Sequence, residues 1–309
     1  MAGGEQADGP TTRDRSWTRR CGHAAWRVAR LPGLIYLGLM IVLTAFQARL
    51  IFPGSASQGT PEAVVRPQPG TELVRLKTAA GETVVALFAP ALKEDGQPLH
   101  DAARRPTLLF FYGNGMSLND TRFLVEEFRE VGANVLAAEY VGYGMSGGRA
   151  GETGCHATAD AAYDHLLARP DVDPKLIVAS GWSIGGAVAI DLAARRPVAG
   201  LAVFSTFTSM TEMAGRHYPY LPISLLLRHR FESLSKIGRV RVPTLIGHGR
   251  DDSLIPYTMS ERLAAAAGGP ATLFTVAGAD HGNFFDAAGP EVDRRLGRFL
   301  KSLGPREGD

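Results

Sequence analysis

The stretch Leu176–Pro197, "LIVASGWSIGGAVAIDLAARRP", contains an apolar run, a serine with glycines on both sides, and an alanine-rich run. The apolar run is typical of a strand. The alanine-rich run is typical of a helix that ends at its basic residues and Pro197. A strand that passes directly into a helix needs a very tight turn, and Gly181 and Gly185 relieve the crowding there. The stretch therefore predicts a strand–turn–helix unit with Ser183 at the turn, where a serine nucleophile would be exposed.

A second serine fits the same G-x-S-x-G pattern. Ser146 lies in "GMSGG" at residues 144–148. The preceding "EYVGYG" already contains a turn, and the following "GRAGETG" cannot propagate a helix. We interpret this segment as a glycine-rich loop after a strand, and we favour Ser183 as the nucleophile because only Ser183 has the strand and the helix that the turn requires.

Apolar runs alternate with helical segments along the rest of the chain. The runs are continuous, as expected for strands covered on both faces, and they lie at residues 106–112, 134–140, 175–182, 200–205, 243–249 and 271–278. Helices are expected near residues 118–130, 155–168, 185–195, 256–267 and 287–302. A hairpin at 71–90, turning at Ala80-Gly81, precedes them. This alternation predicts a mainly parallel sheet with helices on both faces, whose functional loops follow the carboxyl ends of the strands.

The N-terminal region has a different composition. Residues 31–48 form a run of 18 residues without a charge, which is at the lower limit for a helix that crosses a bilayer. Six arginines lie between Arg13 and Arg30. By the positive-inside rule, this asymmetry predicts a basic cytoplasmic tail over residues 1–30 and a transmembrane anchor over residues 31–50.

The stretch 51–70 is rich in Pro, Gly and Ser and is expected to be a linker to a globular domain over residues 71–303. This topology places the domain across the membrane from the N-terminus, in a periplasm, in a lumen or outside the cell. A signal peptide cleaved near Ser55–Ser57 is the alternative. We favour an uncleaved anchor, because the apolar run exceeds a usual signal-peptide core and the cleavage site lies several residues beyond it.

Composition argues against several classes of protein. The formal net charge of +2 over 309 residues is too small to indicate nucleic-acid binding. The two cysteines, Cys21 and Cys155, lie in no Cys-x-x-Cys motif or Cys/His ligand spacing. We therefore expect neither a disulfide framework nor a zinc site, and no metal or organic cofactor.

A serine nucleophile needs a base, and the base needs an acid that orients it. His281 follows the last predicted strand in "VAGADHGNFF", where a loop returns over the sheet edge. Asp251 and Asp252 follow the preceding strand in "TLIGHGRDDSLIP". Composition does not separate these two adjacent carboxylates, and one of them could cap the helix that begins near Pro256. We interpret His248, which precedes both acids, as a turn residue and His281 as the base.

These motifs resemble the α/β-hydrolase superfamily, in particular a membrane-anchored branch with a short cap that includes lipase-like and acyl-protein thioesterase-like enzymes. The resemblance covers residues from about 70 to 302, and "QARLIFP" after the anchor also resembles that branch. The family writes H-G-x-x-D-x-x-x-P after this strand, which matches His248, Gly249, Asp252 and Pro256. The resemblance thereby implies that Asp252 is the acid.

Two departures from the family pattern are visible. Tyr112 stands in "FFYGNG" where the family usually has the histidine of His-Gly-Asn. The segment "EYVGYGMSGG" resembles the family's D-x-R-G-x-G-x-S-x-G loop, but it has Glu139 and Val141 in place of the Asp and Arg. Ser146 occupies the serine of that loop, which is not the nucleophile. The missing histidine is generally structural, so the triad is not affected.

An acyl-transfer enzyme also needs two backbone N–H donors for the oxyanion. One is expected at Ile184, the residue after the nucleophile, at the start of a helix. The other is expected in the loop with Gly113 and Asn114, and the resemblance implies Asn114. Residues about 207–238 are expected to form a cap. Within it, "YPYLPISLLL" at 218–227 could line an acyl pocket, rest on a membrane or pack as a helix on the core.

We therefore predict an α/β-hydrolase fold: a mainly parallel sheet with helices on both faces and a small helical cap, preceded by one N-terminal transmembrane helix. The predicted function is a serine hydrolase that cleaves acyl esters or thioesters of small or lipid-like substrates through Ser183, His281 and Asp252 and an acyl-enzyme. Two alternatives remain open. One is an acyltransferase that uses the same triad, and the other is a non-catalytic binding member of the fold.

Overall fold

The computed structural model describes residues 12–93, 96–99 and 101–304, with side chains from residue 30 onward. The chain divides after Gln47 into two compact units. The first unit contains most of helix α1 (Thr12–Ile51). Within α1, the 22-residue span Arg30–Ile51 contains an 18-residue window with a mean hydropathy of 1.9, so the span is long and apolar enough to cross a membrane. The helix begins well before the expected anchor, so the boundary near residue 30 is a change of composition within one helix.

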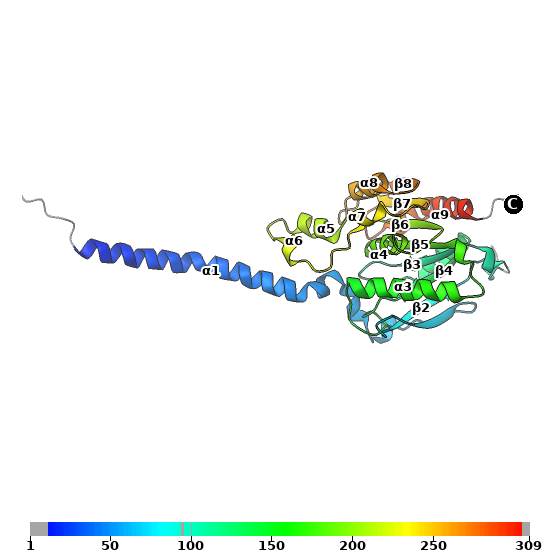
Figure 1. The fold of residues 1–309 in the computed structure, drawn as a ribbon, viewed down its shortest axis with the longest axis horizontal. Coiled ribbons are helices and arrows are strands. Elements are labelled where there is room, and N and C mark those ends of the chain that lie inside the picture. Colours follow the sequence, from blue (N-terminus) through cyan, green and yellow to red (C-terminus); the bar gives the residue numbers. More distant parts are fainter. Residues whose placement is uncertain (1–11, 94–95, 100, 305–309) are drawn as a thin grey trace, which may run out of the picture. The chain divides into compact units, whose positions relative to one another are not determined.

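The second unit contains an eight-stranded sheet in the order β1-β2-β4-β3-β5-β6-β7-β8 (Figure 1). The first two strands form the expected hairpin, β2 also pairs antiparallel with β4, and all other pairs are parallel. The strands are β1 (Glu72–Lys77), β2 (Thr83–Ala89), β3 (Thr107–Phe111), β4 (Asn134–Ala138), β5 (Ile177–Trp182), β6 (Gly200–Phe204), β7 (Thr244–Gly249) and β8 (Ala271–Val276).

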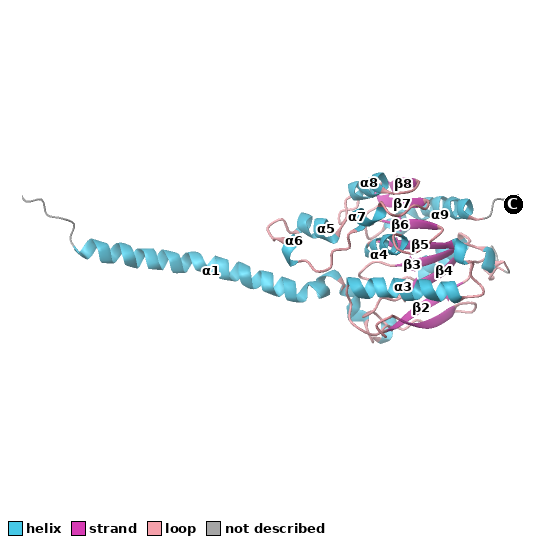
Figure 2. Cartoon of the chain, in the orientation of Figure 1, coloured by secondary structure: helices cyan, strands magenta, loops and turns pink. Residues whose placement is uncertain are grey.

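Helices cover both faces of this sheet (Figure 2). On one face α3 (Glu152–Ala168), α4 (Ile184–Ala193), α7 (Ser233–Ile237) and α8 (Tyr257–Ala266) pack in series. On the other face α2 (Arg122–Glu130) and α9 (Phe284–Leu303) meet where the rings of Phe128 and Phe285 lie 6.1 Å apart. Short 3-10 turns at Ala102–Arg104 and Pro174–Leu176 precede β3 and β5. Every residue of β3, β4 and β6 is buried, which explains why these runs lack polar alternation. The predicted fold class is confirmed.

The stretch 51–70, expected to be a linker, is instead packed on the domain. Phe52 is fully buried, and its ring lies 5.0 Å from the His229 ring and 6.1 Å from the Phe231 ring. Two short 3-10 helices, Pro53–Ser57 and Pro61–Ala63, each begin at a proline. Composition predicted turns correctly but not their packing, because the apolar residues between the turns fill the edge of the core.

Between β6 and β7 the chain forms a cap with helices α5 (Met210–His217) and α6 (Ile223–Leu226) before α7. Figure 1 shows α5 and α6 beyond the strands of the sheet. Tyr220 and Leu225 are 88% and 84% exposed. The interpretation of residues 218–227 as a helix packed on the core is therefore wrong.

Candidate active site

Ser183 occupies a strained turn between β5 and α4. Its backbone has φ 57° and ψ −121°, a left-handed conformation that is uncommon for a residue with a side chain. The end of the neighbouring strand β6 and the loop after it hold this turn. Ser183 N donates to Phe204 O at 2.9 Å, and Thr206 Oγ1 donates to Ser183 O at 2.8 Å. The local sequence thus builds the strand–turn–helix unit that presents a serine hydroxyl at the carboxyl end of a parallel strand.

The flanking glycines are required by close backbone contacts. A Cβ at Gly181 would lie 2.2 Å from Gly185 O, and a Cβ at Gly185 would lie 1.9 Å from Phe111 O. Neither contact is possible for a real side chain. The helix can therefore start this close to the sheet only if both positions are glycine.

Three side chains that are distant in the sequence meet at this turn. His281 Nε2 lies 3.1 Å from Ser183 Oγ, and His281 Nδ1 lies 2.8 Å from Asp252 Oδ2. The residues come from three loops, after β5, β7 and β8, at the carboxyl edge of the sheet. The structure thus brings together the three residues named from the sequence, as a hydrogen-bonded chain from hydroxyl to imidazole to carboxylate.

Asp252 is held as a carboxylate by its surroundings. Its Oδ1 accepts hydrogen bonds from Leu254 N at 3.0 Å and Ile255 N at 2.7 Å. Burial opposes ionisation, but the hydrogen bonds from His248 and His281 outweigh it and lower the pKa of Asp252 from 3.8 to about 2. At neutral pH the group is therefore negatively charged, as an acid that orients an imidazole must be.

His248 is not a turn residue, contrary to our interpretation. It lies in β7 and is fully buried, with Nε2 3.2 Å from Asp252 Oδ2 and 2.9 Å from Ile255 O. Both neighbours of Nε2 are acceptors, so Nε2 carries the hydrogen, and Nδ1 accepts from Ser260 Oγ at 2.6 Å. The signal for this role was its position four residues before Asp252.

Geometry separates the two adjacent carboxylates. Asp251 Oδ2 accepts from Gly278 N at 2.8 Å and thereby joins two loops, whereas Asp252 reaches the imidazole. Helix α8 has no side-chain cap at its N-terminus, so neither acid caps it. A further acid was missed: Asp280 Oδ1 accepts from Ser253 N and from His281 N, both at 2.7 Å. Asp280 therefore ties the loop of Asp252 to the loop of His281.

Trp182 was also missed by reasoning from the sequence. Its ring stacks on the His281 ring, with centroids 5.5 Å apart and an interplanar angle of 24°. Trp182 is the last residue of β5 and stands directly before Ser183. Its stacking restricts the rotation of the imidazole that Asp252 orients by a hydrogen bond.

The loop after β3 borders Ser183. A Cβ at Gly113 would lie 3.7 Å from Ser183 Cβ. Asn114 is firmly held, because its O accepts from Gly54 N at 2.9 Å and its Nδ2 donates to Ile51 O at 2.8 Å. Ile184 is the first residue of α4, so its N–H has no acceptor within the helix.

Ser146 has a structural role in the fold. Its buried hydroxyl donates to Glu139 O at 3.1 Å and accepts from Val85 N at 3.0 Å. Both of its hydrogen bonds join the glycine-rich loop to the neighbouring strands. The Ser146 hydroxyl thus bonds only to backbone groups, whereas the Ser183 hydroxyl lies against the imidazole of His281.

The two departures from the family pattern contact each other. Tyr112 Oη donates to Glu139 Oε1 at 3.1 Å, and the same carboxylate accepts from Leu118 N and Met145 N, each at 2.8 Å. Burial raises the pKa of Glu139, and these hydrogen bonds act in the opposite direction. The unusual residues at positions 112 and 139 therefore form one buried polar contact beneath the loop after β3.

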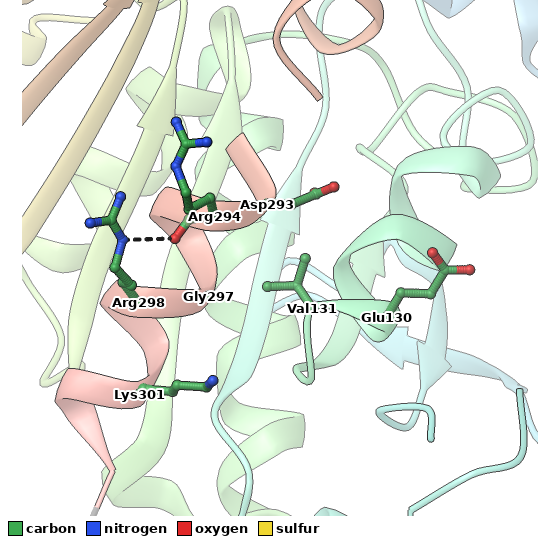
Figure 3. A pocket seen from close by; sticks show the side chains of 7 residues that line it. All are labelled: Glu130, Val131, Asp293, Arg294, Gly297, Arg298 and Lys301. Atoms are coloured by element: carbon green, nitrogen blue, oxygen red, sulfur yellow. Dashed lines mark hydrogen bonds between the residues drawn. The ribbon is translucent and has the colours of Figure 1, made fainter. Parts of the chain in front are cut away.

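A cavity of about 420 Å³ lies elsewhere, between the end of α2 and α9, and is lined by Glu130, Val131, Asp293, Arg294, Gly297, Arg298 and Lys301 (Figure 3). Gly200, which begins β6, lies against Phe299 and Leu303 at the end of α9. The cavity is therefore near the amino ends of the strands, opposite the triad. Within the described part of the chain, no group of three His, Cys, Asp or Glu side chains could hold a metal ion.

Comparison with known proteins shows the family of this chain. Residues 151–304, which include all three side chains, match the prolyl oligopeptidase family. The chain is 34% identical over 265 residues to an uncharacterized protein of Mycobacterium tuberculosis, covering 85% of this chain and 89% of that protein. It is 30% identical over 258 residues to the alpha/beta hydrolase domain-containing protein WAV2 of Arabidopsis thaliana, covering 76% and 80%. The chain belongs to the α/β-hydrolase family.

Solved structures show the same fold. An esterase of Pyrococcus furiosus superposes with a TM-score of 0.62 at 18% identity, covering 78% of this chain and 95% of that one. A propionate-bound esterase of Thermogutta terrifontis gives a TM-score of 0.59 at 23% identity, covering 78% of this chain and all (100%) of that one. At these identities the likeness shows the fold.

Proposed function

We propose that this protein is a serine hydrolase that cleaves acyl esters or thioesters through a covalent acyl-enzyme. The observation that carries the proposal is the chain of contacts from Ser183 Oγ to His281 Nε2 at 3.1 Å and from His281 Nδ1 to Asp252 Oδ2 at 2.8 Å. The position of Ser183 in the strained turn between β5 and α4 of an α/β-hydrolase fold supports the same chemistry.

In the first step, Ser183 Oγ attacks the acyl carbon while His281 Nε2 takes the hydroxyl proton. Asp252 stabilises the imidazolium that forms. His281 then donates this proton to the departing alcohol or thiol, and the acyl group stays on Ser183. Water attacks the acyl-enzyme with His281 again acting as the base, which releases a carboxylic acid and restores the hydroxyl.

Ile184 N–H and Asn114 N–H are proposed to bind the oxyanion. Ile184 N–H stands at the start of α4, where the helix dipole favours negative charge. Asn114 lies in the loop beside the nucleophile and is held from both sides by the segment after the anchor. A preorganised donor of this kind contributes about 3 kcal/mol to the stabilisation of the transition state.

We further propose that the hydrophobic helix Arg30–Ile51 anchors the protein in a membrane. The N-terminal arginines favour a cytoplasmic N-terminus, which places the catalytic domain on the opposite side. A small acyl or lipid-like substrate is consistent with a catalytic domain that is held at a membrane.

Activity-based labelling tests the catalytic proposal. A fluorophosphonate probe should label the full-length protein, and Ser183→Ala should lose the label and lower kcat/KM by about 10⁴-fold or more. Ser146→Ala is the matched control, because it removes the other G-x-S-x-G hydroxyl and should remain labelled. A folded wild-type protein that is not labelled, or a Ser183→Ala variant that is, would contradict the proposal.

The leaving group requires a substrate panel. The match of residues 151–304 to the prolyl oligopeptidase family favours a peptide amide as a second candidate. Ester, thioester and peptide-amide substrates with the same acyl group should be compared on the wild-type protein. Products formed with a competing alcohol or amine would distinguish hydrolysis from acyl transfer.

A further inference from the structure

The tip of the cap, residues 218–227, exposes apolar side chains to solvent. Tyr218, Tyr220 and Leu225 are 57%, 88% and 84% exposed. They lie within eight consecutive positions of the sequence, at α6 and the turn before it. A cluster of exposed apolar side chains on one short segment marks an interaction surface more often than a single exposed residue does.

Basic residues flank the cap tip on both sides. The sequence "RHYPYLPISLLLRHR" at 216–230 contains three arginines and two histidines and no acidic residue. The Arg230 guanidinium lies against the tip itself, where it donates to Ser224 O at 3.0 Å. Tyrosine and leucine bordered by arginine is the composition of a segment that lies in the interface of an anionic bilayer.

The cap tip is also joined to the end of the candidate anchor. The span ends at Ile51, and the next residue, Phe52, is buried against the rings of His229 and Phe231, which follow the tip. Glu152 holds this junction, because its carboxylate accepts from Arg230 N at 2.7 Å and from Phe231 N at 2.9 Å. The segment that follows the cap tip therefore packs on the residue that follows the candidate membrane span.

The same cap contacts the loop that carries the acid of the triad. His217 Nε2 lies 3.1 Å from Leu254 O, two residues after Asp252. Glu212 on α5 forms an ion pair with Arg262 on α8. A membrane surface on which the cap tip docks would thus lie next to the candidate active site.

We propose that the cap tip inserts into the bilayer that holds the anchor, with its tyrosines and Leu225 in the lipid interface and its arginines at anionic headgroups. The cap then directs the site toward acyl substrates within the membrane. The substrate part of this inference rests on the proposed hydrolase function, whereas the docking part does not.

An environment-sensitive fluorophore tests the docking part. The full-length protein, with Cys21→Ser, is labelled at Leu225→Cys with a nitrobenzoxadiazole dye and placed in nanodiscs that contain phosphatidylglycerol. Cys155 is buried and should not react. The matched control is Leu167→Cys, an exposed leucine at the far end of α3. We expect a blue shift and quenching by spin-labelled acyl chains at position 225 and not at 167. Equal aqueous spectra at both positions would overturn the proposal.

Kinetics test the substrate part. Leu225→Ser should reduce hydrolysis of an ester dispersed in the nanodisc bilayer by about tenfold, because the variant lacks the leucine side chain that would be buried in the lipid and therefore docks more weakly. Hydrolysis of a soluble short-chain ester should be unchanged, and Leu167→Ser should affect neither rate. An equal loss on both substrates would place Leu225 in an acyl pocket and overturn the inference. Absence of hydrolysis on every ester would refute the proposed function alone, since the fluorescence result does not depend on it.

Discussion

The carboxylate of Asp252 shows how single contacts define the candidate site. It accepts from the backbone N–H groups of Leu254 and Ile255 on one oxygen and meets His248 and His281 on the other. In the proposed triad, His248 is thus a positioning residue, because it holds the carboxylate of Asp252 and has no hydrogen bond to Ser183. Trp182 plays the equivalent part for the imidazole through ring stacking.

The lowered pKa of Asp252 predicts that the free energy of unfolding depends on pH. The native pKa is about 2 and the ordinary value is 3.8, so the unfolded chain takes up this proton first as the pH falls. The carboxylate therefore stabilises the native state above about pH 4, and this contribution disappears as the pH falls through about 2. Its size is no more than about 2 kcal/mol, since each pKa unit corresponds to about 1.4 kcal/mol and residual solvent screening reduces it.

Urea unfolding of the wild type and Asp252→Asn, followed from neutral to strongly acidic pH, measures this effect. The free-energy difference between the two proteins should be largest at neutral pH and should shrink below about pH 4. A difference that stays constant over the whole range would mean that the carboxylate of Asp252 does not titrate in the way described.

Among the elements, the segment after the anchor has an unexpected role. Ile51 and Gly54 hydrogen-bond to Asn114, the proposed second oxyanion donor, and Gln58 Nε2 donates to Ser146 O at 2.9 Å. Residues 51–58 therefore behave as a part of the catalytic domain that supports the loop after β3. This arrangement also favours an uncleaved anchor, since cleavage near Ser57 would remove Phe52 and Gly54 from their contacts.

A substitution at Gly54 should disturb this support. A Cβ there would lie 2.5 Å from a ring carbon of Tyr143 and 2.7 Å from Asn114 O. Gly54→Ala should therefore lower the free energy of unfolding by about 1–3 kcal/mol and reduce kcat more than KM, because the oxyanion donor shifts. Gly215→Ala in α5, where no heavy atom lies within 4 Å, is the control and should not destabilise the protein. Similar effects of both variants, by thermal unfolding and kinetics, would refute the role of Gly54.

For the molecule as a whole, the sequence and the helix Arg30–Ile51 predict a single-pass protein with a cytoplasmic N-terminus. In bacterial spheroplasts, added protease should remove a C-terminal epitope and spare an N-terminal one. The protein should keep its full mass and stay in the membrane after alkaline extraction. A soluble product that lacks about 55 residues would instead indicate a signal peptide cleaved near Ser55–Ser57.

The positions of the strands and the strand–turn–helix unit at Ser183 followed from local patterns, because an apolar run, a glycine pair and a helix end are each encoded within a few neighbouring residues. Ser183, Asp252 and His281 could be named as candidates for the same reason, since each lies in the loop that follows its own strand. The order of the strands in the sheet came only from the structure. The preference for Asp252 over Asp251 came from a resemblance. The structure brings Asp252, and not Asp251, to His281.

Contacts between distant residues were not predictable in this way. The Tyr112–Glu139 hydrogen bond, the stacking of Trp182 on His281 and the burial of Phe52 each join segments that local patterns treat separately. His248 looks like a polar turn residue in the sequence, and only the packing of β7 in the sheet buries it beside Asp252. Backbone preferences are local, whereas side-chain partners depend on how the sheet brings strands together. Tertiary structure therefore decided what holds the site in place.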